Sequence, residues 1–153
     1  MTISSAKRCR QALTLIGALP ILGWRSSVEP RSRDVTIVAH EYAFTVPATL
    51  AAGLTTFHFV NRGRVTHEVQ LFRFNRGVSA ATARRFLASG DVPDSVADRS
   101  GSVLIAAPGD SVREGLTVRL LAGERYALLC QFRDAPDKPR HSSLGMFGLV
   151  EVR

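Results

Sequence analysis

The sequence predicts an all-β protein, a Greek-key antiparallel β-sandwich with one short inserted helix. The first observation is that from Asp34 onward apolar and polar residues alternate with a period of two. The second is that turn-forming residues separate these segments at regular intervals, a pattern typical of sandwiches of ~100–120 residues. The chain has 153 residues, of which 45% are hydrophobic and 22% charged, enough for one domain with its own core.

The strands are predicted where apolar residues fall on one face of an extended segment. In the second of them Phe57 and Phe59 share a face, and near the C-terminus Tyr126, Leu128 and Cys130 do the same. The predicted strands are Asp34–His40, Leu54–Val60, Val65–Phe74, Ser102–Ala107, Ser111–Leu121, Arg125–Phe132 and Met146–Arg153.

One helix is predicted at Ala80–Ser89. Ser79 is suited to cap its N-terminus, and Gly90 to end it in a left-handed conformation. We expect it to pack on the sandwich through three inward residues, Ala83, Phe86 and Leu87.

The N-terminal segment explains most of the basic character of the chain, whose formal net charge is +7. Residues 1–26 contain four basic residues and no acidic one, and an apolar stretch at 12–24 follows the first three. A basic segment before such a stretch is typical of a secretory signal peptide. We therefore expect a signal peptide or N-terminal anchor at 1–27, a linker at 28–33, a domain at 34–153, and a periplasmic or extracellular location. A disordered leader is the alternative.

Nucleic-acid binding is not expected. The remainder of the chain is only mildly basic, and no aromatic residues interleave its arginines as in single-strand binders. The sequence also contains no Gly-rich phosphate-binding loop.

Four residues carry the candidate chemistry: His67, Cys130, His141 and Met146. Two imidazoles, a thiolate and a thioether are the ligands of a mononuclear blue-copper site. Each residue alone has an ordinary explanation, since a lone cysteine or methionine on an apolar strand is usually part of a core. The set and its order favour copper.

The chain resembles the cupredoxins, the type 1 copper β-sandwiches, from about Asp34 to Arg153. The motifs are the Asn61-x-Gly63 loop before a strand-borne histidine, Tyr-x-Leu-x-Cys130, and His141-x4-Met146. The stretch Glu41-Tyr-Ala-Phe is similar to uncharacterised exported cupredoxin-like proteins. The resemblance implies a sandwich with one copper ion at one end, held by His67, Cys130, His141 and Met146.

The sequence departs from the family pattern at two points. Ten residues separate Cys130 from His141, which is long beside the compact ligand loops of plastocyanin-like members. Glu68 stands where many members have asparagine after the first histidine. Because a carboxylate near a copper thiolate is unfavourable, we expect Glu68 to face away from the site.

The leading hypothesis is an exported, monomeric one-electron carrier and not an enzyme. By family analogy the more exposed ligand edge is His141, and three cations beside it, Arg133, Lys138 and Arg140, favour an acidic redox partner protein.

The alternative is a copper storage or delivery protein, and the long Cys–His loop is the feature that supports it. A thiol enzyme and a metal-free adhesive sandwich are less favoured. His40 and His58 are expected on the surface, outside the site.

Overall fold

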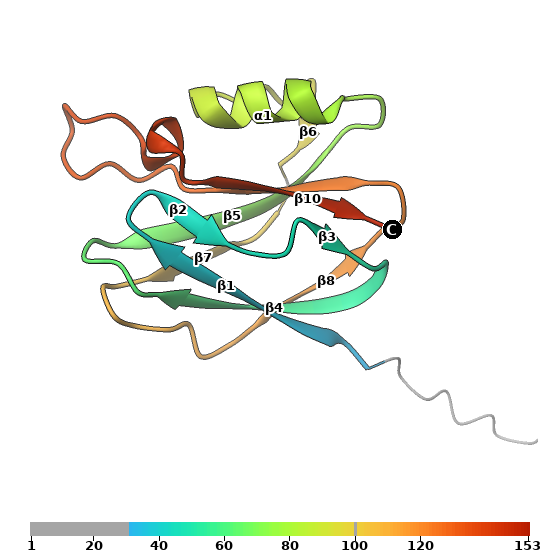
Figure 1. The fold of residues 1–153 in the computed structure, drawn as a ribbon, viewed down its shortest axis with the longest axis horizontal. Helices are drawn as coiled ribbons and strands as arrows, with labels where there is room; N and C mark the ends of the chain where they lie inside the picture. Colours follow the sequence, from blue (N-terminus) through green and yellow to red (C-terminus); the bar gives the residue numbers. More distant parts are fainter. Residues whose placement is uncertain (1–30, 100) are drawn as a thin grey trace, which may run out of the picture.

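The computed structural model describes residues 31–99 and 101–153 as two β-sheets packed face to face, with a helix on the outside of one of them (Figure 1). The predicted leader at 1–27 and the first half of the predicted linker, 28–30, lie outside the described residues. The elements are β1 Arg33–His40, β2 Ala43–Thr45, β3 Thr49–Leu50, β4 Gly53–Asn61, β5 His67–Phe74, α1 Ala80–Ser89, β6 Ala97–Asp98, β7 Val103–Ala106, β8 Leu116–Leu120, β9 Arg125–Leu129, the 3-10 turn η1 His141–Leu144, and β10 Phe147–Val152.

The predicted sandwich is present, but its sheets are mixed. One sheet has the order β2-β1-β4-β8, and the other has the order β3-β10-β9-β5-β6 with β7 also paired to β5. The β1–β4 and β3–β10 pairs are parallel, whereas the remaining pairs are antiparallel. Parallel neighbours are possible because the chain crosses to the opposite sheet between the two members of each pair.

Two apolar clusters hold the sandwich together. The first fills the space between the sheets and includes Phe57, Phe59 and Leu128. The second lies between the outer face of the β9–β10 sheet and α1, and includes Phe74 and Leu129. Strand β9 is therefore buried on both faces.

The inserted helix matches its prediction at both ends. The Ser79 hydroxyl accepts a hydrogen bond from the backbone N–H of Thr82, and Gly90 ends the helix in the left-handed region with φ +69°. Ala83 and Leu87 are fully buried and Phe86 is half-buried against the second cluster. The helix thus covers the outer face of a sheet, as expected.

The strand predictions differ from the structure mainly at their ends. Strand β8 is shorter than its predicted segment, because residues 111–115 form a loop and an isolated bridge before the regular ladder begins. The short strands β2, β3 and β6 carry too few residues to give a periodic signal. Among the described residues no helix is both long and apolar enough to cross a membrane.

Candidate metal centre

The four predicted ligands lie at the ends of elements that meet at one end of the sandwich. His67 opens β5, Cys130 directly follows β9, His141 opens η1, and Met146 directly precedes β10. Strands β5 and β9 are hydrogen-bonded neighbours, which brings the first two ligands side by side. All four side chains are buried, with exposed fractions of 1% or less.

Three of the four side chains converge through their metal-binding atoms. Nδ1 of His67 lies 3.2 Å from Nδ1 of His141, which in turn lies 3.4 Å from Sγ of Cys130. The candidate ligand atoms of these three residues all lie within 4.8 Å of one another. Two imidazoles and a thiolate fit copper, because soft sulfur favours Cu(I) and imidazole suits both oxidation states.

Met146 is placed beside these ligands by the backbone. Its N–H donates to the carbonyl of His141 at 2.9 Å, and its carbonyl accepts from the N–H of Cys130 at 3.2 Å. The side chain belongs to the same apolar cluster as Cys130. A thioether with this backbone tether suits the weak axial position of a blue-copper site.

The environment of Cys130 opposes use of the thiol as a nucleophile. Burial raises the pKa of the Cys130 thiol to about 11, although the backbone N–H groups of Glu68 and Phe132 donate to the sulfur and lower the pKa. A reactive cysteine needs exposure and a depressed pKa. The surroundings instead suit a buried sulfur whose charge a bound cation would stabilise.

A buried asparagine holds the loop that leads to His67. The Asn61 side-chain amide donates to the carbonyls of Val65 at 2.8 Å and Ala106 at 3.0 Å, and its oxygen accepts from the Gly63 N–H at 2.8 Å. A Cβ on Gly63 would lie 2.9 Å from Nε2 of His67, so this close approach requires glycine. The Asn-x-Gly motif thus positions the first ligand.

His141 is 1% exposed, against 0% for the other three predicted ligands, so the expected more exposed ligand edge is itself buried. Oδ1 of Asp134 lies 2.9 Å from Nε2 of His141, and the Tyr42 ring lies edge-on to the imidazole with centroids 5.1 Å apart. The Tyr42 hydroxyl donates to Asp134 at 2.5 Å. No sequence pattern singled out Tyr42 or Asp134 for this role.

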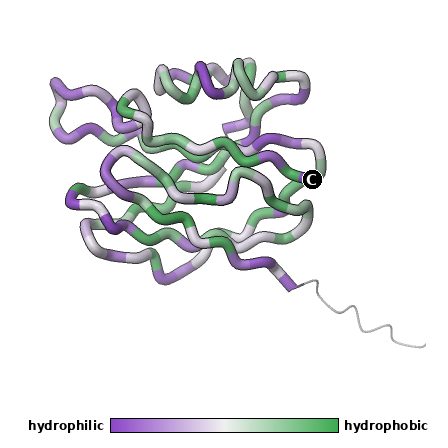
Figure 2. Tube along the Cα trace, viewed as in Figure 1, coloured by the Kyte–Doolittle hydropathy of each residue, from purple (hydrophilic) through white to green (hydrophobic). Residues whose placement is uncertain are grey.

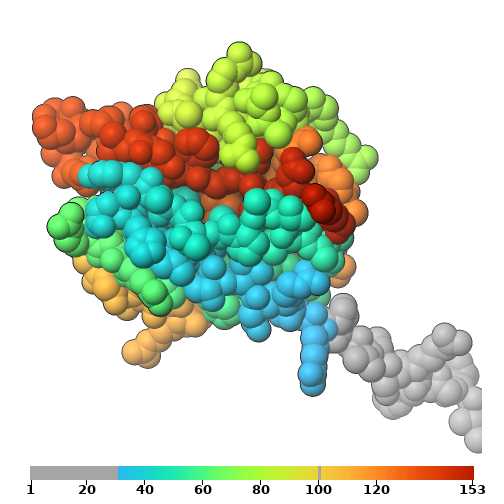
Figure 3. All heavy atoms as spheres, viewed as in Figure 1, coloured from blue at the N-terminus to red at the C-terminus, as the bar shows by residue number. Residues whose placement is uncertain are grey.

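The two segments that supply this cover lie side by side at one end of the molecule. The loop at 131–140 projects beyond the sheets and is largely hydrophilic (Figure 2), and the β1–β2 turn lies beside it (Figure 3). The ligand centre therefore has a polar cover made from two segments that are far apart in the sequence.

Glu68 lies outside the ligand group, but its carboxylate is close to the cysteine ligand. The carboxylate accepts from the Gln131 N–H at 2.9 Å and from the Gln70 amide at 3.0 Å, and its charge is among the causes that raise the pKa of Cys130. His40 is exposed and His58 pairs with Asp34 at 3.1 Å, both outside the ligand group.

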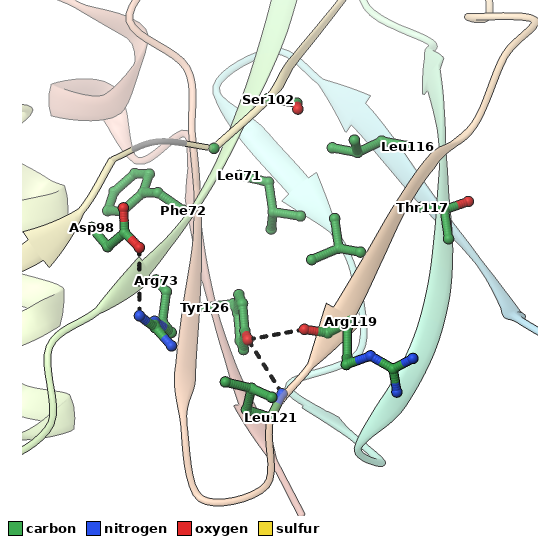
Figure 4. A pocket seen from close by; sticks show the side chains of 12 residues that line it. Leu71, Phe72, Arg73, Asp98, Ser102, Leu116, Thr117, Arg119, Leu121 and Tyr126 are labelled. Carbon is green, nitrogen blue, oxygen red and sulfur yellow. Dashed lines mark hydrogen bonds and ion pairs between the residues drawn. The ribbon is translucent and has the colours of Figure 1, made fainter.

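A surface pocket of about 440 Å³ lies apart from the ligands, between β5 and the β8 region (Figure 4). Its lining includes the ion pair of Arg73 and Asp98. The hydroxyl of Tyr126 accepts from the N–H of Leu121 at 3.2 Å and donates to the carbonyl of Arg119 at 3.4 Å. Among the described residues that line this pocket there is no cysteine or histidine, and none of the four predicted ligands is among them.

Solved structures with this fold identify the architecture. Auracyanin from the photosynthetic bacterium Roseiflexus castenholzii, in its dithionite-reduced form, is 25% identical, with a TM-score of 0.51 over 80% of this chain and 98% of that one. The fold is that of a cupredoxin. Auracyanin B is 23% identical, with a TM-score of 0.48 over 82% of this chain and 91% of that one. Auracyanin A from Chloroflexus aurantiacus, a "blue" copper protein, is 21% identical, with a TM-score of 0.43 over 78% and 99%.

No protein-family model and no curated protein matches the sequence. The cupredoxin fold and the internal geometry agree with each other, because the ligand group lies at one end of the sandwich as the resemblance implies. The chain thus has a His/Cys/His/Met copper-binding arrangement within a cupredoxin sandwich.

Proposed function

We propose that the protein is an exported mononuclear copper protein that carries one electron at a time. The observation that carries this proposal is the convergence of two imidazole Nδ1 atoms and one thiol sulfur in a buried group within a cupredoxin sandwich. The auracyanin with the same fold was studied in a dithionite-reduced form, which supports a redox role.

The ligand roles follow from the placement of the side chains. His67, Cys130 and His141 would hold the metal through two imidazoles and a thiolate, and Met146 would add a weak thioether ligand. A copper ion held by these residues would supply one-electron chemistry between Cu(II) and Cu(I). Because the ligands are fixed by strand ends and hydrogen bonds, they would move little between the two states, which favours fast exchange.

The surface beside His141 supports a protein partner with acidic groups. Arg133 and Lys138 are exposed in the 131–140 loop, and Arg64 is exposed in the loop before β5. Asp134 and Asp137 in the same region reduce the net positive charge of this surface. Steering by these cations should weaken as salt is added, because exposed charges are screened over about 8 Å at physiological ionic strength.

We also propose a location and an assembly state for the protein. Residues 1–27 would direct export or anchor the domain 34–153, which would work as a monomer in the periplasm or outside the cell. The protein would be a carrier and not a catalyst, it would not bind nucleic acid, and any membrane contact would be through the N-terminal anchor.

Copper storage or delivery is the second candidate. The buried position of His141 and the ten-residue loop between Cys130 and His141 favour it, because a covered metal exchanges electrons less readily with a partner. The thiol enzyme is disfavoured by the buried thiol with its raised pKa.

The test is to add Cu(II) to the full chain and record the visible spectrum, with Cys130→Ser in parallel. An intense thiolate-to-copper band at one copper per chain, lost in the variant, is the expected result. Absence of both the band and stoichiometric copper would contradict the carrier and the storage protein alike.

Voltammetry then separates the two candidates. Reversible, fast electron exchange supports the carrier, and a rate that falls with salt for an acidic partner protein supports the proposed surface. Sluggish exchange with tight retention of Cu(I) favours storage or delivery.

A further inference from the structure

Each ligand imidazole faces a carboxylate on the side away from its candidate metal-binding nitrogen. For His141 the contact is direct, because Nε2 lies 2.9 Å from Oδ1 of Asp134. Asp134 belongs to the long loop between the cysteine and the second histidine, the segment in which this chain departs from compact ligand loops. The carboxylate therefore belongs to the long loop by which this chain differs from cupredoxins with compact ligand loops.

For His67 the carboxylate is that of Glu41. Nε2 of His67 is buried and has no hydrogen-bond partner in the structure. This atom and Oε1 of Glu41 both lie 2.9 Å from the position that a Cβ on Gly63 would take, so the two atoms lie within about 6 Å of each other, with no hydrogen bond between them. Glu41 is held there by the backbone N–H of Arg64, which donates to Oε1.

The two carboxylates are joined by Tyr42, which follows Glu41 in the β1–β2 turn. Its hydroxyl donates to Oδ2 of Asp134 at 2.5 Å, and its ring contacts the imidazole of His141. Tyr42 has φ +59°, a left-handed conformation that a bulky residue rarely adopts. A strained residue persists only where its surroundings hold it in place. Here the contacts with Asp134 and His141 hold Tyr42.

We propose that Glu41 and Asp134, tied together by Tyr42, are positioning residues that orient the two ligand imidazoles and lower the reduction potential of the copper site. This inference rests on the proposed copper function and deepens it. A histidine ligand usually donates its outer N–H to an oxygen, which fixes the tautomer and makes the metal-binding nitrogen more basic. For His141 the contact between Nε2 and Asp134 leaves Nδ1 to face the metal, whereas for His67 the nearby charge of Glu41 acts without a hydrogen bond.

The direction of the effect follows from charge. Two carboxylates beside the imidazoles stabilise the site more when it is Cu(II) than when it is Cu(I), so the oxidised state is favoured. Removing either charge must raise the potential. The loss of such an outer partner typically weakens metal binding by about 10- to 100-fold. Each tenfold weakening of Cu(II) relative to Cu(I) binding raises a one-electron potential by about 59 mV.

The experiment uses the full chain loaded with copper and compares Asp134→Asn and Glu41→Gln with Asp137→Asn. Asp137 lies in the same loop, is exposed, and pairs with Lys138 at 3.6 Å, so its variant removes an equal charge without touching an imidazole. The midpoint potential is read by spectroelectrochemistry. We expect the first two variants to raise it by an amount equivalent to about a tenfold or larger change in relative affinity, and Asp137→Asn to change it far less.

A second readout needs no metal. Long-range ¹⁵N spectra of the metal-free chain report the tautomer of His141, and Asp134→Ala should shift the proton population away from Nε2 whereas Asp137→Ala should not. The inference is overturned if the potential shifts equally in Asp134→Asn and Asp137→Asn, or if Asp134→Ala leaves the tautomer of His141 unchanged. In either case a blue band in the parent protein still supports the proposed copper function. A parent protein without the band contradicts both.

Discussion

The carbonyl of Gly90, at the end of the inserted helix, accepts a hydrogen bond from Nη1 of Arg140, the residue before the ligand His141, at 2.7 Å. The Gln131 amide, on the residue after Cys130, donates to the same carbonyl at 3.0 Å. The last carbonyls of a helix lack partners within it and carry partial negative charge, so a guanidinium and an amide suit this position. The helix end thus anchors both ends of the long ligand loop.

We predict that Arg140→Ala loosens this loop without unfolding the sandwich. Loss of one charged, half-buried hydrogen bond should lower the free energy of unfolding by about 1 kcal/mol. The larger effect should be a broadened or shifted thiolate-to-copper band, because His141 loses the neighbour that fixes its backbone. The matched control is Arg84→Ala on an exposed position of α1, which should leave the spectrum unchanged. Identical spectra for the two variants would refute the anchoring role.

Gly90→Ala should disturb the same contact from the helix side. Gly90 has φ +69°, and a Cβ there would lie 2.6 Å from the Ser142 hydroxyl oxygen. The left-handed conformation alone costs a non-glycine residue about 1–2 kcal/mol. Gly77→Ala is the control, because Gly77 has φ +89° with nothing within 4 Å of the added Cβ. Thermal unfolding should show a larger loss of stability for Gly90→Ala than for Gly77→Ala. Equal losses would mean that the Ser142 side chain moves away from the added Cβ at no cost.

Local patterns in the sequence were sufficient for the longer strands and the helix of this fold. The period of two along β1 and β4 and the caps of α1 depend on a few neighbouring residues, where propensity and burial act directly. The parallel pairing of β1 with β4 has no such signature, because it depends on which sheet each strand enters. Pairing order is therefore a property of the whole chain.

The same distinction applies to the metal centre. The ligand residue types and their order were visible because metal chemistry restricts them to histidine, cysteine and methionine. The cover over His141 could not be predicted from the sequence, because Tyr42 and Asp134 are 92 positions apart and each is an ordinary surface residue by itself. The expectation of an exposed imidazole came from family analogy, and the long loop that distinguishes this chain replaces solvent with Asp134.

Asn61→Ala should weaken the sandwich at the metal end. The variant removes two donated bonds and one accepted bond, to Val65, Ala106 and Gly63, and leaves buried backbone groups without partners. At about 0.5–1.5 kcal/mol per bond the loss of three bonds should total about 1.5–4.5 kcal/mol. Asn75→Ala is the control, since that exposed side chain donates one bond to the Ser95 carbonyl at 3.0 Å. Urea unfolding that gives the same loss for both variants would contradict a bracing role for Asn61.

Copper should stabilise the folded chain, and among the histidines the effect should depend on the buried His67 and His141 and not on the surface ones. A ligand that binds only the folded state adds about 2.7 kcal/mol at a free concentration one hundred times its dissociation constant. We expect this rise in thermal stability to be reversed by a chelator and lost in His67→Gln. His58→Gln should retain it, because His58 is half-exposed, pairs with Asp34 and lies outside the ligand group. Equal stabilisation of the two histidine variants would place the copper elsewhere on the molecule, whatever the spectrum of the parent protein.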